Sequence, residues 1–107
     1  MNTVEQNDSA LDRRKMSRLE FAALAEVVDI ETRATFSMRM TDIGTGGCFL
    51  DTMFPLSVGS RVRVTLGRGR TQFQADGNVV SSQAPLGMGV AFDELTPDQR
   101  VALMRLI

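Results

Sequence analysis

The sequence predicts a small all-β domain of five or six short strands, a closed or nearly closed antiparallel barrel with one helix at the carboxy terminus. The chain has 107 residues, which is the length of a single domain. Apolar and polar side chains alternate through short segments, and glycine or proline turn signals separate these segments about every ten residues. The last residues change to a helical spacing. Short strands followed by one helix favour a closed barrel whose open end the helix covers.

The amino-terminal part of the chain is polar before it becomes apolar. Residues 1–12 show no periodicity, and we expect a flexible leader there and one barrel domain over residues 13–107. The segment over residues 19–30 is ambiguous, because the spacing of its apolar residues fits a helix. Val27 and Ile30 are β-branched, and the next segment alternates cleanly, so we favour a strand.

Alternation predicts the remaining strands. From residue 34 onward, Phe36, Met38 and Met40 share one face, and the glycines of residues 42–47 indicate a turn. Gly77 is a candidate bulge in a later strand. The other strands are expected around residues 48–50, 62–66, 71–82 and 88–92, with a hairpin connection at residues 67–70.

The carboxy-terminal segment carries the signals of a helix start. Thr96 and Gln99 have the spacing of a capping box, and Pro97 occupies the first helical position. The apolar spacing that follows predicts the buried face of this helix, made of Val101, Leu103, Met104 and Ile107.

The composition excludes several functional classes. Lys plus Arg is 12 and Asp plus Glu is 13, a formal net charge of −1, whereas domains that bind nucleic-acid polymers are usually strongly basic. The chain has one cysteine and no histidine, which argues against a disulfide scaffold, a His/Cys zinc site and a Ser–His–Asp triad. We find no membrane-spanning run and no signal peptide. We therefore expect neither an enzyme nor a membrane-inserted protein.

Two other groups of residues have simple structural interpretations. We expect Cys48 to be a small core residue rather than a redox thiol. A second anion-binding surface is conceivable from the arginines of the later strands, but a polar barrel face and a hairpin tip explain them more simply. These arginines are Arg61, Arg63, Arg68 and Arg70.

Two short motifs carry candidate binding chemistry. Arg14 and Arg18 form an R-x-x-x-R sequence preceded by Arg13, and a later D-x-G-x-x-G sequence begins at Asp42 and ends at Gly47. The planar fork of arginine matches phosphate oxygens and the O6/N7 edge of guanine. From the residues alone, a solvated charge run and a turn closed by the Asp42 side chain remain the alternative interpretations.

The ordered pair of motifs resembles the PilZ domain family, bacterial receptors for cyclic di-GMP. That family carries R-x-x-x-R before its first strand and [D/N]-x-S-x-x-G about two strands later. The resemblance covers residues 13–107 and includes V-G-S-R-V from Val58 and G-M-G-V-A-F from Gly87. It implies a six-stranded antiparallel PilZ-like β-barrel with a carboxy-terminal helix, a cytoplasmic and non-enzymatic module, and cyclic di-GMP as ligand with no cofactor.

The resemblance also assigns roles to individual residues. It implies that Arg14 and Arg18 contact phosphate and guanine, that Asp42 accepts from the guanine edge, and that Gly47 lets the backbone approach the ligand. Arg13 lies directly before the motif, where an arginine in this family accompanies an intercalated dimer of the ligand.

Gly44 is the one departure from the family pattern, because the family has a serine at this position. The missing hydroxyl removes a hydrogen bond of about 0.5–1.5 kcal/mol, or about 1.5–3 kcal/mol if the acceptor is charged. Since about 1.4 kcal/mol corresponds to tenfold in affinity, the loss is about an order of magnitude or more. Thr45 or a water molecule could replace the hydroxyl.

Two functional hypotheses follow. In the first, cyclic di-GMP orders the arginine loop and changes the surface offered to an unidentified effector protein that controls motility, exopolysaccharide or biofilm formation. In the second, Gly44 marks a degenerate PilZ domain that acts as a protein–protein adaptor without nucleotide. An oligonucleotide-binding barrel is disfavoured, because it needs stacking aromatic residues and the chain has no Trp or Tyr.

Overall fold

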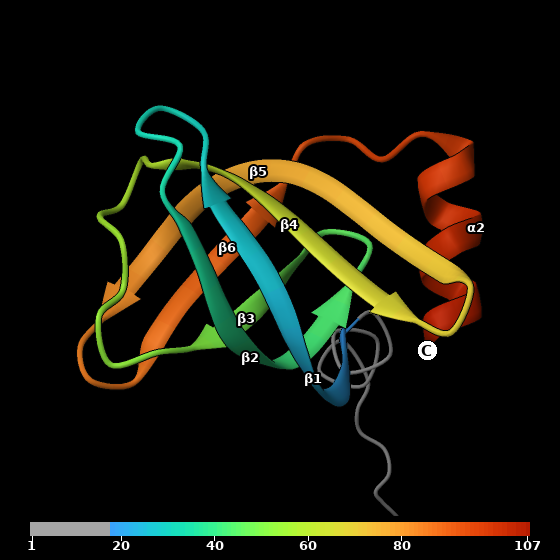
Figure 1. Cartoon of the computed structure of the whole chain (residues 1–107), viewed down its shortest axis with the longest axis horizontal. Helices are drawn as coiled ribbons and strands as arrows, with labels where there is room; N and C mark the ends of the chain where they lie inside the picture. The colour runs from blue at the N-terminus through green and yellow to red at the C-terminus, as the bar shows by residue number, and fades with distance from the viewer. Residues whose placement is uncertain (1–17) are drawn as a thin grey trace, which may run out of the picture.

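The computed structural model describes the backbone of residues 18–107 and the side chains from residue 23 onward. The expected leader over residues 1–12 lies outside the described residues. Six strands and one helix follow each other along the chain (Figure 1): β1 (Arg18–Asp29), β2 (Thr35–Gly44), β3 (Gly47–Asp51), β4 (Arg61–Arg68), β5 (Thr71–Gln83), β6 (Gly87–Phe92) and α2 (Pro97–Leu106).

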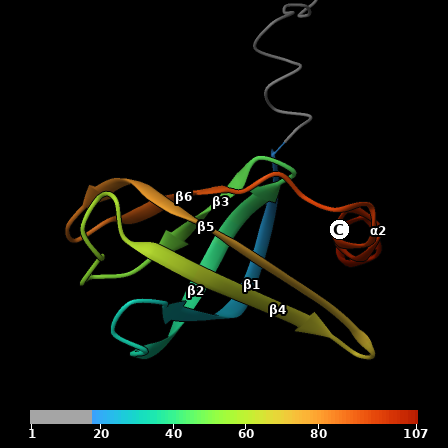
Figure 2. The same cartoon turned by 90° about the horizontal axis from the view of Figure 1, so that it is seen from above.

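The six strands form a closed antiparallel barrel in the order β1-β2-β3-β6-β5-β4. The barrel closes where β4 pairs with β1, so the segment between β3 and β4 runs along one end of the barrel (Figures 1 and 2). The prediction of a six-stranded antiparallel barrel with a carboxy-terminal helix is confirmed. The ambiguous segment over residues 19–30 is a strand for most of its length.

Alternating side chains of all six strands fill the barrel. Phe73 is the largest fully buried side chain, and its ring meets Phe92 edge to face at 5.6 Å and 61°. Cys48 is buried in the same cluster, as its interpretation as a core residue predicts. The remaining buried apolar residues of the strands are Ala25, Val27, Met38, Met40, Ile43, Leu50, Val62, Val64, Leu66, Ala75, Val79, Met88 and Val90.

The glycine-rich segment after β2 is shorter than the sequence predicts. We expected a turn over residues 42–47, but β2 continues through Asp42 and Ile43 to Gly44, and Ile43 is fully buried. The reason is a register shift between Met40 and Asp42, which resets the alternation and returns Ile43 to the interior. The prediction of a turn at Asp42 is therefore wrong, and Asp42 lies within a paired strand.

Gly77 is not a bulge. The register of β5 against β6 shifts between Val79 and Ser81, whereas Gly77 is a regular partner of Phe92. A Cβ at Gly77 would collide with the carbonyl oxygen of Ala91, so glycine is needed there for close strand approach.

The helix begins as predicted but buries a different face. The Thr96 hydroxyl accepts from the Gln99 amide at 3.1 Å, and the Gln99 side chain accepts from the Thr96 amide at 2.8 Å, which confirms the capping box. Leu103 and Leu106 enter the core where α2 packs on β5. The expected face is wrong for three of its four residues, since the exposed ones are Val101, Met104 and Ile107.

Replacing Phe73 by alanine tests the packing of the barrel interior. We expect the Phe73→Ala variant to lose about 3–5 kcal/mol of unfolding free energy, because it removes a buried ring and leaves a cavity. Urea unfolding measures the loss, with Leu24→Ala as the control, because Leu24 is 69% exposed. Equal losses for the two variants would contradict the assignment of Phe73 to the core.

Candidate functional site

The ends of β1 and β2 bring three of the predicted site residues to one rim of the barrel. In the antiparallel register, Arg18 is the Cα partner of Gly44, and Glu20 is the partner of Asp42. Arg18 and Asp42 therefore occupy diagonal positions on one face of the strand pair. Diagonal positions lie about 7–8 Å apart, within the reach of a long side chain.

Asp42 lies in a strongly constrained part of this rim. It is half-buried, and β2 is paired on both sides there, with Glu20 of β1 and with Phe49 of β3. Pairing on both sides therefore fixes the backbone position of Asp42 in the barrel wall.

Gly47 follows the β2–β3 turn. Strand packing alone explains why this position is a glycine. It opens β3 as the partner of Ala91 in β6 and is buried. A Cβ at this position would collide with the carbonyl oxygen of Val90 and lie 3.1 Å from its carbonyl carbon. Glycine at position 47 therefore permits the close pairing of β3 with β6.

The turn itself is anchored to β6. The Phe92 amide donates to the Gly46 carbonyl at 2.9 Å. Because Gly46 connects β2 to β3, this bond and the Gly47 pairing fix the end of β2, where Asp42 and Gly44 lie. Arg13 and Arg14 lie outside the described residues, so the structure brings together four of the six predicted site residues: Arg18, Asp42, Gly44 and Gly47.

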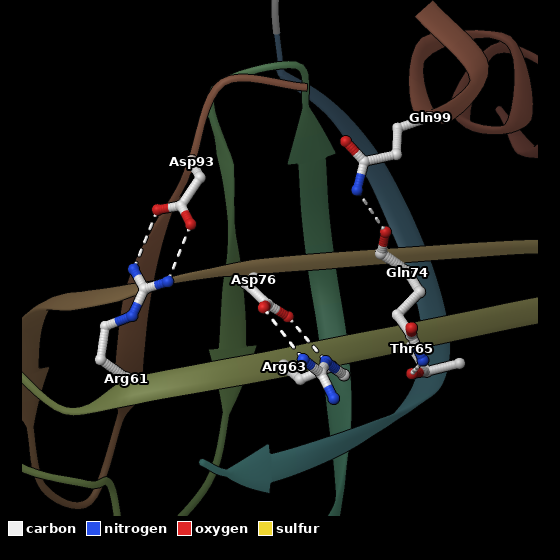
Figure 3. A network of polar contacts seen from close by, with 7 residues as sticks. All are labelled: Arg61, Arg63, Thr65, Gln74, Asp76, Asp93 and Gln99. Carbon is white, nitrogen blue, oxygen red and sulfur yellow. Dashed lines mark hydrogen bonds and ion pairs between the residues drawn. The ribbon is translucent and has the colours of Figure 1, made fainter. Parts of the chain in front are cut away.

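Paired charges cover the outer face of β4 and β5 (Figure 3). The Arg61 guanidinium donates to both carboxylate oxygens of Asp93, at 2.9 and 2.8 Å, and Arg63 donates to both oxygens of Asp76, at 2.8 and 3.1 Å. The hydrogen bonds that Arg61 donates to Asp93 lower the pKa of that carboxyl group. Donating to Asp93 and to Asp76 raises the pKa of Arg61 and of Arg63, respectively. These two arginines form a polar face with internal partners rather than a second anion-binding surface.

Gln99 connects the helix to this polar face. Its side-chain amide donates to the Gln74 carbonyl at 2.9 Å, and the Gln74 side chain donates to the Thr65 hydroxyl, also at 2.9 Å (Figure 3). A surface hollow of about 310 Å³ lies between Arg63, Asp76 and the start of α2. Several of the polar groups that line this hollow are already hydrogen-bonded to one another.

Sequence reasoning did not find these ion pairs, although one signal was present. Counting outward from a two-residue turn at Gly69 and Arg70 makes Arg63 the cross-strand partner of Asp76, as the structure has it. The bond between Arg61 and Asp93 joins residues far apart in the sequence, and it depends on the pairing of β5 with both β4 and β6. Among the described residues, no group of acidic residues and cysteine is arranged to hold a metal ion. No helix in the described part of the chain is long and apolar enough to cross a membrane.

The comparison with known families decides the identity of the barrel. A family model described as "PilZ domain" matches residues 12–107. The chain belongs to the PilZ domain family. PilZ domains are generally receptors that bind cyclic di-GMP rather than enzymes.

Solved structures support the PilZ fold. The crystal structure of a PilZ domain of CeSA from a cellulose synthesizing bacterium matches with a TM-score of 0.68 and 15% sequence identity. The match covers 84% of this chain and 93% of that one. At this identity the likeness concerns the fold alone. A search of curated proteins found no match.

Replacing Gly47 by alanine tests its packing role in the PilZ barrel. We expect the Gly47→Ala variant to lose about 1–3 kcal/mol of unfolding free energy without any ligand present, because backbone atoms of β6 would have to move. Urea unfolding measures the loss. Gly46→Ala is the matched control, since an added Cβ there meets no described atom within 4 Å. An unchanged midpoint for Gly47→Ala would contradict the packing role.

Proposed function

We propose that this PilZ domain is a cyclic di-GMP receptor whose ligand binds between the amino-terminal arginines and the rim at the end of β2. The observation that carries the proposal is the β1–β2 register. It makes Arg18 the partner of Gly44 and the diagonal neighbour of Asp42, so residues of the two sequence motifs meet on one face of one strand pair. If the arginines were only a solvated charge run, there would be no reason for Arg18 to pair with a residue of the second motif.

The chemistry of the two motifs suits the two kinds of group on the ligand. Cyclic di-GMP has two phosphates and two guanines. Arg14 and Arg18 supply guanidinium forks for phosphate oxygens and for the O6/N7 edge of guanine. Asp42 supplies an acceptor for the N1–H and N2–H₂ edge. Arg13 lies next to Arg14 and supplies a further plane that can stack on a second, intercalated ligand molecule.

The proposed output is a change in the amino-terminal segment. Arg13 and Arg14 precede β1, whereas Asp42 lies in a strand that is paired on both sides. Ligand bound to both would tie the segment before β1 to the barrel wall and alter the surface offered to an effector protein in the cytoplasm. The regulated process is motility, exopolysaccharide or biofilm formation.

A second candidate function is an adaptor that binds a protein without nucleotide. Two observations favour it. Gly44 lacks the hydroxyl that the family motif has, and Gly47 is required by the pairing of β3 with β6 whether or not a ligand binds. The two candidates differ in whether cyclic di-GMP binds to the purified chain at all.

Isothermal titration calorimetry with cyclic di-GMP tests the receptor. We expect binding to the wild type and an affinity about tenfold to a hundredfold lower for Arg14→Ala, Arg18→Ala and Asp42→Ala, since each loses a hydrogen bond to a charged group. Arg70→Ala is the matched control, because it removes the same charge at the exposed tip of the β4–β5 hairpin. Binding that none of the three variants weakens would contradict the proposed site, and no binding to the wild type would favour the adaptor.

Replacing Gly44 by the serine of the family motif tests whether the proposed cyclic di-GMP site is present but weakened. We expect Gly44→Ser to bind cyclic di-GMP about tenfold more tightly than the wild type, because the hydroxyl adds one hydrogen bond to the ligand. Calorimetry of both proteins under the same conditions gives the ratio. Unchanged or lower affinity in a folded variant would mean that Gly44 does not lie at the ligand.

A further inference from the structure

An aromatic residue of β3 lies beside Asp42 on the outer wall of the barrel. Phe49 is the Cα partner of Asp42 across the β2–β3 pair. Directly opposite residues of an antiparallel pair share one face of the sheet, and their Cβ atoms lie about 4.5–5.5 Å apart. The ligand contacts proposed above come from arginines, a carboxylate and glycines, so this ring is a further group at the rim that they do not use.

The alternation of β3 sets the direction of the Phe49 side chain. Its two neighbours along the strand, Cys48 and Leu50, are buried in the core. Their partners in β2, Ile43 and Met40, are buried as well. Because successive side chains of a strand point to opposite faces, Phe49 points away from the core. It is half-buried on the outer wall rather than enclosed.

Two glycines of β6 leave room for the ring. Gly89 is the partner of Phe49 on its other side, and Gly87 lies two residues earlier in the same strand. A Cβ at Gly87 would lie 2.9 Å from the Cε2 atom of Phe49, which is closer than Cβ atoms approach their neighbours in proteins. The ring therefore lies close to the backbone of β6, with one side toward the sheet. The rest of its surface accounts for its partial exposure.

The two cross-strand neighbours of Asp42 differ in what they can offer to a base. Glu20 of β1 is acidic, whereas Phe49 of β3 is aromatic. A carboxylate that accepts from the N1–H and N2–H₂ edge of guanine lies in the plane of the base, so this contact leaves both faces of the base uncovered. Aromatic side chains cover such faces by stacking, while polar groups bind the edges. Since β3 lies between β2 and β6, a base that extends from Asp42 toward β6 passes over Phe49.

We propose that one guanine of cyclic di-GMP stacks on Phe49 while Asp42 binds the edge of the same base. The inference rests on the proposed function, because it adds a contact for that ligand at that site. It divides base recognition between two strands. Asp42 selects guanine through its hydrogen-bonding edge, and Phe49 adds affinity without selecting among bases, because every base has a π face.

A tryptophan at position 49 reports on stacking through its fluorescence. The chain has no Trp, so Phe49→Trp contains a single indole. Because a stacked guanine quenches indole emission, we expect quenching that saturates at the dissociation constant that calorimetry gives for the same variant. Phe36→Trp is the matched control: Phe36 is 37% exposed near the start of β2, whereas Asp42 lies near its end, and the emission of this variant should not change.

Replacing Phe49 by leucine separates stacking from packing. Leucine keeps an apolar side chain beside the β6 glycines but has no aromatic face. We therefore expect Phe49→Leu to unfold in urea with a cooperative transition, as a folded protein does, and to bind cyclic di-GMP about tenfold more weakly than the wild type in calorimetry. Phe36→Leu should bind with the affinity of the wild type.

The outcomes distinguish this inference from the function on which it rests. If the wild type does not bind cyclic di-GMP in calorimetry, both are overturned. If Arg14→Ala and Asp42→Ala weaken binding, but Phe49→Leu binds like the wild type and Phe49→Trp is not quenched at saturating ligand, the stacking role alone is overturned and the receptor stands. Quenching of Phe49→Trp together with weaker binding by Phe49→Leu supports both.

Discussion

The close approach of β6 to its two neighbours is the constraint on which the rest of this barrel depends. Gly47 of β3 and Gly77 of β5 lie where β6 carbonyls occupy the space that a Cβ would need, so β6 can pair with both strands. The same strand anchors the β2–β3 turn through the Phe92 amide. Barrel closure and the position of the candidate site are therefore consequences of the same packing.

This arrangement divides the proposed binding site into two physically different halves. Asp42 and Gly44 belong to a strand with neighbours on both sides, so their positions are set by the barrel whether or not a ligand is present. Arg18 is the point where the barrel meets the arginine motif, because it is both the first residue of β1 and the second arginine of R-x-x-x-R. A receptor built in this way can couple ligand binding to the segment before β1 without deforming the barrel.

Local pattern was sufficient to predict the fold class, because alternation and turn residues are properties of short segments. It failed where distant contacts decide the outcome. The register shift beside Asp42 depends on pairing with β3, and spacing alone could not show that α2 buries Leu106 and exposes Met104. The motifs predicted which residues could form a site. They could not predict that Arg18 pairs with Gly44, because this pairing depends on the register between β1 and β2.

The central claim is that the rim at the end of β2 is where cyclic di-GMP meets the barrel. Amide NMR during a titration with cyclic di-GMP tests this claim most directly, because each backbone amide reports on its own surroundings. The account predicts progressive shifts at Asp42, Gly44 and Gly47, with the amides of Phe54 and Leu86 unchanged at the opposite end of β3. Shifts confined to the amides around Phe54 and Leu86, or a titration that moves no amide of the rim, would contradict it.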